Sequence, residues 1–278
     1  MDVWLGTCGY NGCPTTGEIR AFRPPEGGKI LDRQGRLMGR LTVIRRVNVP
    51  IEKIPKHVRE AFLATEDRRF YDHNGLDWHG LLRAGARNVG AFGVREGFST
   101  ITMQVARNTF IAEHFVGSRT MRRKLMELRL SRLIEQSLTK DQILALYLNV
   151  IYLGNGVNGV EAASLDLFGK NINQVSLSEG AVLAALPKAP SVYTPRRHPE
   201  RAVQRRNLVL GLMADQGYVT ATQAASAQRG GRQLRVAGQQ IARERAQQLA
   251  RGVDPRGTDH DAAVHLVAPH RRQSRTAT

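Results

Sequence analysis

Helix signals follow one another along the middle of this chain, and they constrain its fold more than any other feature. From Pro55 onward, Val58, Ala61, Phe62 and Thr65 recur three or four residues apart, which is the spacing of one buried helix face. A proline suits the first turn of such a helix. Few segments of the middle region alternate as a strand would, so we predict a mainly α fold.

Capping residues mark where further helices begin. Thr139 with Gln142, and Ser176 with Glu179, form capping boxes, in which each side chain bonds the backbone N–H of the other residue. Glycine or proline marks several of the helix ends. The predicted helices span 55–66, 78–89, 99–108, 118–137, 139–149, 176–187 and 199–217.

The two ends of the chain differ from its middle. Residues 1–48 are rich in Gly, Pro and Arg, and the loosely alternating run 27–49 predicts a short hairpin or an extended segment. Beyond residue 229 no aromatic residue occurs, and the polar, basic tail is expected to be partly disordered. We therefore divide the chain into an N-terminal segment 1–48, a domain 49–228 and a linker-like tail 229–278.

The charge balance predicts an anionic partner. Lys and Arg number 41 against 24 for Asp and Glu, a net charge of +17. This excess favours nucleic acid, an acidic membrane surface or a phosphorylated substrate. Cys8 and Cys13 lack the neighbouring ligands of a zinc site, and a local disulfide and two free thiols are equally compatible with them. No apolar run is long enough to span a bilayer.

The stretch EDRRFYDHNGLD, residues 66–77, places charged groups at the end of an apolar helix. Glu66 is a candidate general base if its surroundings raise its pKa or direct it at a proton. Asp72, His73 and Asp77 then form the wall of a polar cleft. The alternative is an ordinary exposed helix end.

The stretch EGFSTITMQVARNTF, residues 96–110, begins a helix with hydroxyl groups. Ser99 and Thr100 stand where unsatisfied backbone N–H groups attract anions, phosphates among them. Gln104, Arg107 and Asn108 continue one polar side. The alternative is a common N-cap followed by a solvated face.

The basic helix after Ser118 carries one acidic group among many cations. Arg123 and Lys124 precede Glu127 by four and three residues, so all three lie near one side of the helix. Nearby cations favour the ionised form of Glu127. The alternative is a salt-bridged surface helix.

Five motifs in this order resemble the peptidoglycan glycosyltransferase domain of class A penicillin-binding proteins and of monofunctional peptidoglycan glycosyltransferases. They lie within about Val49 to Ala227. The motifs are EDRRFYDHNGLD, GFSTITMQVARN, RRKLMEL, LYLNVIYLGNGVNGVEAAS and LSEGAVLAALPKAPSVYTP. The resemblance implies a lysozyme-like helical lobe with a smaller, mobile jaw lobe.

The resemblance also implies a reaction. Such enzymes polymerise lipid II, a disaccharide–peptide on a polyprenyl pyrophosphate, by attack of an acceptor 4-hydroxyl on the anomeric carbon of the growing glycan strand. The anomeric centre inverts, and lipid pyrophosphate leaves. Glu66 is then the general base and Glu127 the second carboxylate, roughly 6.5–9.5 Å apart by analogy with inverting glycosidases. Mg²⁺ or Mn²⁺ is expected to bridge Glu127 and the pyrophosphate, with no organic cofactor.

The resemblance extends to substrate-binding residues. They are Asp67, Phe70, His73, Ser99, Thr100, Gln104, Arg107, Asn108, Arg123, Lys124, Asn149 and Gly154. The chain departs from the usual family pattern at Met103 in place of Gln, Ala145 in place of an acid, and Asn158 and Leu167 in place of Tyr. These departures concern the substrate groove, since both carboxylates are present.

The implied location is the outer face of the bacterial cytoplasmic membrane. The implied partners are lipid II, the growing glycan strand, the membrane surface and other cell-wall synthesis proteins, and no nucleic acid. Family members normally carry an N-terminal transmembrane helix, and residues 3–9 are interpreted as its outer remnant; class A members continue into a transpeptidase. We expect an apolar patch around Ala91, Phe92, Phe110 and Phe115 to enter the membrane interface.

Three other function classes compete with this interpretation. A lysozyme-like glycan-cleaving enzyme needs one carboxylate protonated near neutral pH, and the basic surroundings of Glu127 oppose that state there. A nucleic-acid binder needs aromatic and basic residues interleaved on one face, but aromatic residues make up only 6% of the chain. A non-catalytic scaffold does not require Glu66 and Glu127, and both are intact.

Overall fold

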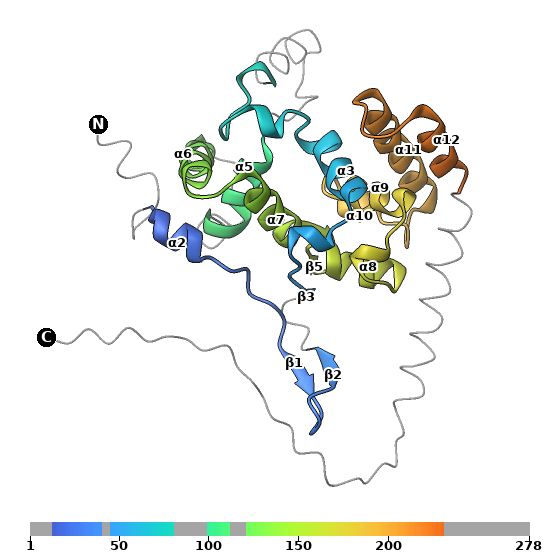
Figure 1. The fold of residues 1–278 in the computed structure, drawn as a ribbon, viewed down its shortest axis with the longest axis horizontal. Helices are drawn as coiled ribbons and strands as arrows, with labels where there is room; N and C mark the ends of the chain where they lie inside the picture. Colours follow the sequence, from blue (N-terminus) through green and yellow to red (C-terminus); the bar gives the residue numbers. More distant parts are fainter. Residues whose placement is uncertain (1–12, 41–44, 81–98, 112–120, 231–278) are drawn as a thin grey trace, which may run out of the picture.

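The structure is a computed structural model that describes residues 13–40, 45–80, 99–111 and 121–230 (Figure 1). Helices make up most of these residues, which confirms the mainly α prediction. The helices are α2 (Thr16–Ala21), α3 (Lys56–Glu66), α5 (Ile101–Ala106), α6 (Met121–Ser137), α7 (Lys140–Val150), α8 (Val160–Phe168), α9 (Leu177–Ala185), α10 (Pro190–Tyr193), α11 (Pro199–Asp215) and α12 (Ala221–Arg229). A π-helical turn, Arg107–Ile111, continues α5.

The caps that start and end these helices are largely those predicted. Complete capping boxes begin α7 at Thr139 and α9 at Ser176. After α11, Gly217 has φ +76°, and the backbone N–H of Tyr218 donates to the Met213 carbonyl at 2.9 Å, which is a Schellman stop. The prediction omitted α2, α8, α10 and α12, although capping boxes at Thr15 and Thr220 also begin α2 and α12.

Two small sheets complete the fold. β1 (Lys29–Leu31) and β2 (Leu37–Arg40) pair antiparallel, confirming a hairpin in 27–49, and this hairpin projects from the helical body (Figure 1). β3 (Arg45–Arg46), β5 (Val157–Asn158) and β4 (Tyr152–Gly154) form a second sheet in that order. Strands are few in the middle region, as expected, and the sequence did not indicate β4 and β5, because strands of two or three residues are too short to show alternation.

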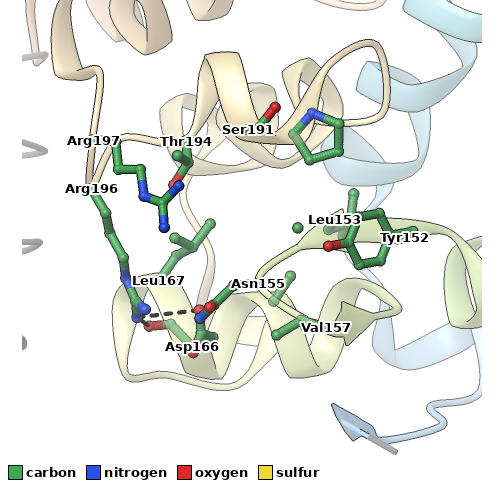
Figure 2. A pocket seen from close by; sticks show the side chains of 13 residues that line it. Tyr152, Leu153, Asn155, Val157, Asp166, Leu167, Ser191, Thr194, Arg196 and Arg197 are labelled. Carbon is green, nitrogen blue, oxygen red and sulfur yellow. Dashed lines mark hydrogen bonds and ion pairs between the residues drawn. The ribbon is translucent and has the colours of Figure 1, made fainter.

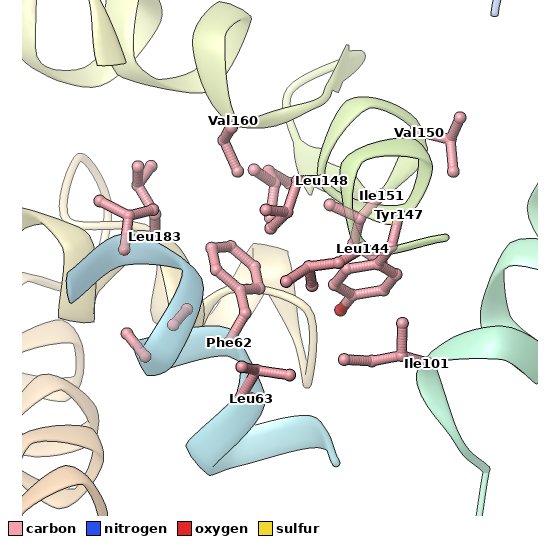
Figure 3. Packing of buried hydrophobic residues seen from close by; sticks show 14 of the residues in the cluster. Phe62, Leu63, Ile101, Leu144, Tyr147, Leu148, Val150, Ile151, Val160 and Leu183 are labelled. Carbon is pink, nitrogen blue, oxygen red and sulfur yellow. The ribbon is translucent and has the colours of Figure 1, made fainter. Parts of the chain in front are cut away.

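One core joins the helices that carry the predicted motifs. α9 packs against α3 and α11, while α5 packs against α6 and α7. Phe62 of α3 and Tyr147 of α7 meet edge to face, with ring centroids 6.0 Å apart (Figure 3). Because α3 and α5 both contribute to this core, the end of α3 and the start of α5 are held close together.

Several predictions fall on residues outside the described ranges. Most of the predicted helix 78–89 does so, and so do Ala91, Phe92 and Phe115 of the predicted membrane patch. Phe110 is described, and it packs partly buried against Phe22, with ring centroids 5.1 Å apart, so it belongs to the core. In the described part of the chain, no helix has both the length and the apolar character needed to cross a membrane. Cys13 is disulfide-bonded.

Candidate active site

Glu66 is the last residue of α3, and its side chain meets α5. Gln104 Nε2 donates a hydrogen bond of 2.9 Å to Glu66 Oε2. Burial raises the pKa of the Glu66 carboxyl, and the Gln104 hydrogen bond and the charges of Arg205 and Arg107 oppose that rise only in part. A partly buried carboxyl with a raised pKa suits proton transfer, as a base or as an acid.

Asp67 and His73 hold the start of α5 beside Glu66. His73 Nε2 lies 3.0 Å from both carboxylate oxygens of Asp67, and the backbone N–H of Ile101 donates to Asp67 Oδ2 at 3.0 Å. Thr100 caps α5, and its hydroxyl donates to a loop carbonyl at 2.7 Å. Asp67, His73 and Thr100 are all buried, and these bonds go to the protein itself. Their surroundings therefore favour a positioning role over the direct substrate contact predicted from the sequence.

The turn after Glu66 does form a cleft wall. Asp72, His73 and Asp77 line a cavity of about 800 Å³ together with side chains of α6 that include Arg129 and Arg132. This agrees with the polar wall predicted for the turn.

Glu127 lies buried on α6, with a relative exposure of 1%. Lys124 Nζ is 3.0 Å from Glu127 Oε2, while Arg123 Nε and Arg107 Nη1 are 3.3 Å and 3.7 Å from Oε1. Lys124 Nζ also donates to Ser99 Oγ at 2.7 Å. Burial lowers the pKa of Lys124, and the charge of Glu127 opposes that change. The alternative of a salt-bridged surface helix is therefore wrong for Glu127.

Arg107 interacts electrostatically with both Glu66 and Glu127. Its guanidinium pairs with Glu127, and its positive charge also lowers the pKa of Glu66. Asn108 follows it in the π-helical turn and is partly buried. Three cations around Glu127 leave a positive surplus, which favours an anionic group at this end of the site. The separation expected between the two carboxylates stays a prediction.

We call Glu66 and Glu127, together with Gln104, Arg107, Arg123 and Lys124, the carboxylate cluster. This cluster does not fit a divalent cation held by protein ligands alone. Mg²⁺ requires several oxygen ligands, and Glu127 is instead surrounded by cations. Among the residues that the structure describes, no three His, Cys, Asp or Glu side chains group as a metal site would require.

Three other residues that were predicted to bind substrate, Phe70, Asn149 and Gly154, contact mainly other parts of the protein. Phe70 is buried, with Lys140 Nζ 4.4 Å from the centre of its ring. Asn149 Nδ2 donates to the Val49 carbonyl at 2.9 Å, and the Val49 N–H donates back to Asn149 Oδ1 at 2.9 Å. Gly154 lines a different cavity, at the turn between β4 and β5. The structure therefore does not bring these three residues to the carboxylate cluster as substrate contacts.

Sequence reasoning missed two residues that interact electrostatically with Glu66, namely Tyr147 and Arg205. The buried hydroxyl of Tyr147 has no hydrogen-bond partner among the described residues, and Figure 3 shows it directed between Leu63 and Ile101. Burial raises the pKa of Tyr147, and the charge of Glu66 adds to that rise. Arg205 acts from α11, far along the chain, and no local pattern could have indicated it.

Met103 shows why one departure from the family pattern is tolerated. Its side chain is fully buried. A thioether is well suited to such a packed position, because it is apolar and flexible. Its neighbour Gln104 carries the hydrogen bond to Glu66.

Comparison with known proteins agrees with the motifs. Residues 34–214 match the transglycosylase family. The chain is 46% identical over 214 residues to penicillin-binding protein 1A of Aquifex aeolicus (strain VF5), which covers 77% of this chain and 29% of that protein. It is 46% identical over 200 residues to penicillin-binding protein 1F of Bacillus subtilis (strain 168), covering 72% of this chain and 28% of that protein. The chain thus spans less than a third of the length of these relatives.

A solved structure was also matched. The crystal structure of penicillin-binding protein 1A from Haemophilus influenzae aligns over 74% of this chain and 21% of its own, with 27% identity and a TM-score of 0.43. The fold described above rests on this chain alone. Because the family match covers more than half of the sequence, the chain belongs to the transglycosylase family.

Proposed function

We propose that the chain is a peptidoglycan glycosyltransferase that polymerises lipid II at the outer face of the bacterial cytoplasmic membrane. The observation that carries the proposal is that the site has two carboxylates with different surroundings. Glu66 is partly buried and has a raised pKa, and Glu127 is surrounded by cations, while the charge of Arg107 acts on both carboxylates. Membership of the transglycosylase family supports the same reaction class.

Glu66 has the surroundings of a general base. Its raised pKa increases its affinity for the proton of an acceptor hydroxyl, and Gln104 fixes the direction of one carboxylate oxygen. A positioned base of this kind contributes about 10²–10⁴-fold to a rate. In the proposed reaction, Glu66 takes the proton of the acceptor 4-hydroxyl as the oxygen attacks the anomeric carbon from the face opposite the leaving group.

The cations around Glu127 suit the departing pyrophosphate. Lys124 donates a hydrogen bond to Glu127 and Arg123 forms an ion pair with it, both from α6, and Lys124 also donates to Ser99. Charge-assisted hydrogen bonds from Lys and Arg stabilise phosphate oxygens as negative charge develops on them. A pyrophosphate leaving group needs no proton donor, and the role that the contacts suggest for Glu127 is to hold the cations in place.

The lipid tail of the proposed substrate stays in the bilayer, so the carboxylate cluster has to work close to the membrane surface. The surplus of Lys and Arg favours anionic headgroups, at about 1 kcal/mol for each side chain near the surface. The dependence on Mg²⁺ or Mn²⁺ expected from the family stays a prediction, and titration of the metal in the polymerisation assay measures it. Association with other cell-wall synthesis proteins also stays a prediction.

The raised pKa of Glu66 also favours a second candidate, a lysozyme-like enzyme that cleaves finished glycan. In that case Glu66 acts protonated, as a general acid. The two candidates predict opposite pH dependence. A base is active above its pKa, and an acid is active below it.

The test is incubation of the protein with labelled lipid II in detergent, followed by sizing of the product. We expect polymer from the wild type, and a loss of about 10²–10⁴-fold in rate for Glu66→Gln. Glu52→Gln is the matched control, because Glu52 is exposed and lies outside the cluster. Near wild-type turnover by Glu66→Gln, or cleavage of finished glycan without consumption of lipid II, would contradict the proposal.

A further inference from the structure

A separate cavity of about 620 Å³ opens between the β4–β5 turn, α8 and α10 (Figure 2). Neither Glu66 nor Glu127 lines it. Its apolar walls come from Leu153, Val157 and Leu167. This volume is within the range of about 300–1,000 Å³ typical of sites for small ligands.

The cavity carries a surplus of positive charge. Asp166 is buried and pairs with two guanidinium groups, Arg45 Nη2 at 2.5 Å and Arg196 Nη2 at 3.2 Å. Figure 2 shows the guanidinium of Arg197 directed toward the cavity. Within the described ranges, the Arg197 side chain has no hydrogen bond or ion pair. Asp166, Arg196 and Arg197 line the cavity and Arg45 pairs with Asp166 from outside the lining, so the lining has a net positive charge that attracts an anion.

The turn that forms one side of the cavity is held in place before any ligand binds. Asn155 adopts φ +54°, a left-handed conformation that is uncommon for residues other than glycine, and its carbonyl accepts from Arg45 Nη1 at 2.8 Å. Gly154 has φ +98°, and a Cβ there would come within 3.0 Å of Pro190 on α10. The wall is thus fixed by contacts on both sides, which reduces the entropy lost on binding.

The combination of apolar walls and an unpaired guanidinium identifies the ligand chemistry. A carboxylate accepts two parallel hydrogen bonds from one guanidinium. Small apolar side chains next to that carboxylate would lie against Leu153, Val157 and Leu167. Inorganic phosphate would leave these walls without a partner, and a neutral sugar would leave Arg197 unused.

We propose that this cavity binds a short peptide that ends in a carboxylate and carries small apolar side chains. The inference rests on the proposed function, in which the substrate is a disaccharide bearing a peptide. The cavity then holds the peptide branch while the sugar reacts at the carboxylate cluster.

The experiment titrates the full chain with N-acetyl-trialanine and with its C-terminal amide, followed by amide chemical shifts in NMR spectra. We expect the acid to bind about tenfold more tightly than the amide, because loss of one charge-assisted hydrogen bond costs at least about 1.4 kcal/mol. Arg197→Gln should weaken binding of the acid by a similar factor. Ser191→Trp should block it, because Ser191 is an exposed residue of the cavity lining.

Arg201→Gln is the matched control, since it makes the same charge change on an exposed residue outside the cavity lining. Equal binding of acid and amide would overturn the inference. So would wild-type affinity in Arg197→Gln, equally tight competition by inorganic phosphate, or no binding of the acid at concentrations on the order of 10 mM.

Polymerisation of lipid II is measured separately. Selective peptide binding by a protein that makes no polymer would remove the proposed function and leave the peptide site. Polymerisation without selective peptide binding would remove only the peptide site.

Discussion

Gln104→Met tests whether the hydrogen bond to Glu66 controls catalysis. Methionine keeps the length and approximate volume of the side chain but removes the amide that donates to Glu66 Oε2 at 2.9 Å. The core around α5 should therefore stay packed. The change isolates one electrostatic contribution to the pKa of Glu66.

The expected magnitude follows from the strength of that bond. A hydrogen bond to a charged group contributes about 1.5–3 kcal/mol, and about 1.4 kcal/mol corresponds to one pKa unit. The pKa of Glu66, already raised by burial, should then rise further, because the hydrogen bond that opposes the rise is lost. If Glu66 is the base, the rate below that pKa should fall about 10- to 100-fold, because less of the carboxyl is ionised.

The assay measures kcat/KM for lipid II against pH, which reports ionisations in the free enzyme. The rising limb of the profile should move to higher pH in Gln104→Met and stay in place in Gln204→Met, an exposed control on α11. An unchanged limb would refute the link between Gln104 and Glu66. A falling limb that moves to higher pH, so that activity extends into more alkaline solution, would instead identify Glu66 as a general acid.

Three further predictions concern the phosphate end of the site and the scaffold. Lys124→Ala should raise KM for lipid II, and Glu127→Gln should lower turnover; normal steady-state rates in both variants would exclude the pyrophosphate assignment. Asn149→Ala should lower the free energy of unfolding by about 1–3 kcal/mol in urea titration, because partly buried backbone groups of Val49 lose their partners. Gly159→Ala should lower the Tm, because φ is +82° and a Cβ there would come 2.6 Å from the Asn149 carbonyl oxygen. An unchanged Tm would contradict that clash.

The pH dependence of stability provides a check on Glu66 that is independent of activity. Its folded-state pKa is raised, so the folded protein binds that proton more tightly than the unfolded chain does. This contribution to stability is present below the unfolded pKa and is lost as pH rises through the folded pKa. Glu66→Gln should therefore be at least as stable as the wild type at pH 7 in thermal unfolding, and a marked loss of stability would contradict the raised pKa of Glu66.

Most helix positions could be predicted because their signals are local. A capping box such as Thr139 with Gln142 involves residues three apart, and the buried face of α3 is repeated every three or four residues. Glu66, Glu127, Lys124 and their neighbours could be singled out by the family motifs. The short strands β4 and β5 could not be predicted, since two or three residues show no periodicity.

The sequence by itself determined the mainly α class, most helix starts and the set of polar residues around the two carboxylates. Only the tertiary structure decided which of those residues contact the two carboxylates and which support the scaffold. Asp67 and Gln104 look equally polar in the sequence, but Asp67 bonds the start of α5 while Gln104 reaches Glu66, 38 residues away. The cavity at Arg197 likewise depends on Arg45 and Asp166, which are 121 residues apart. Burial and charge act through space, and contacts between such distant residues exist only once the helices have packed.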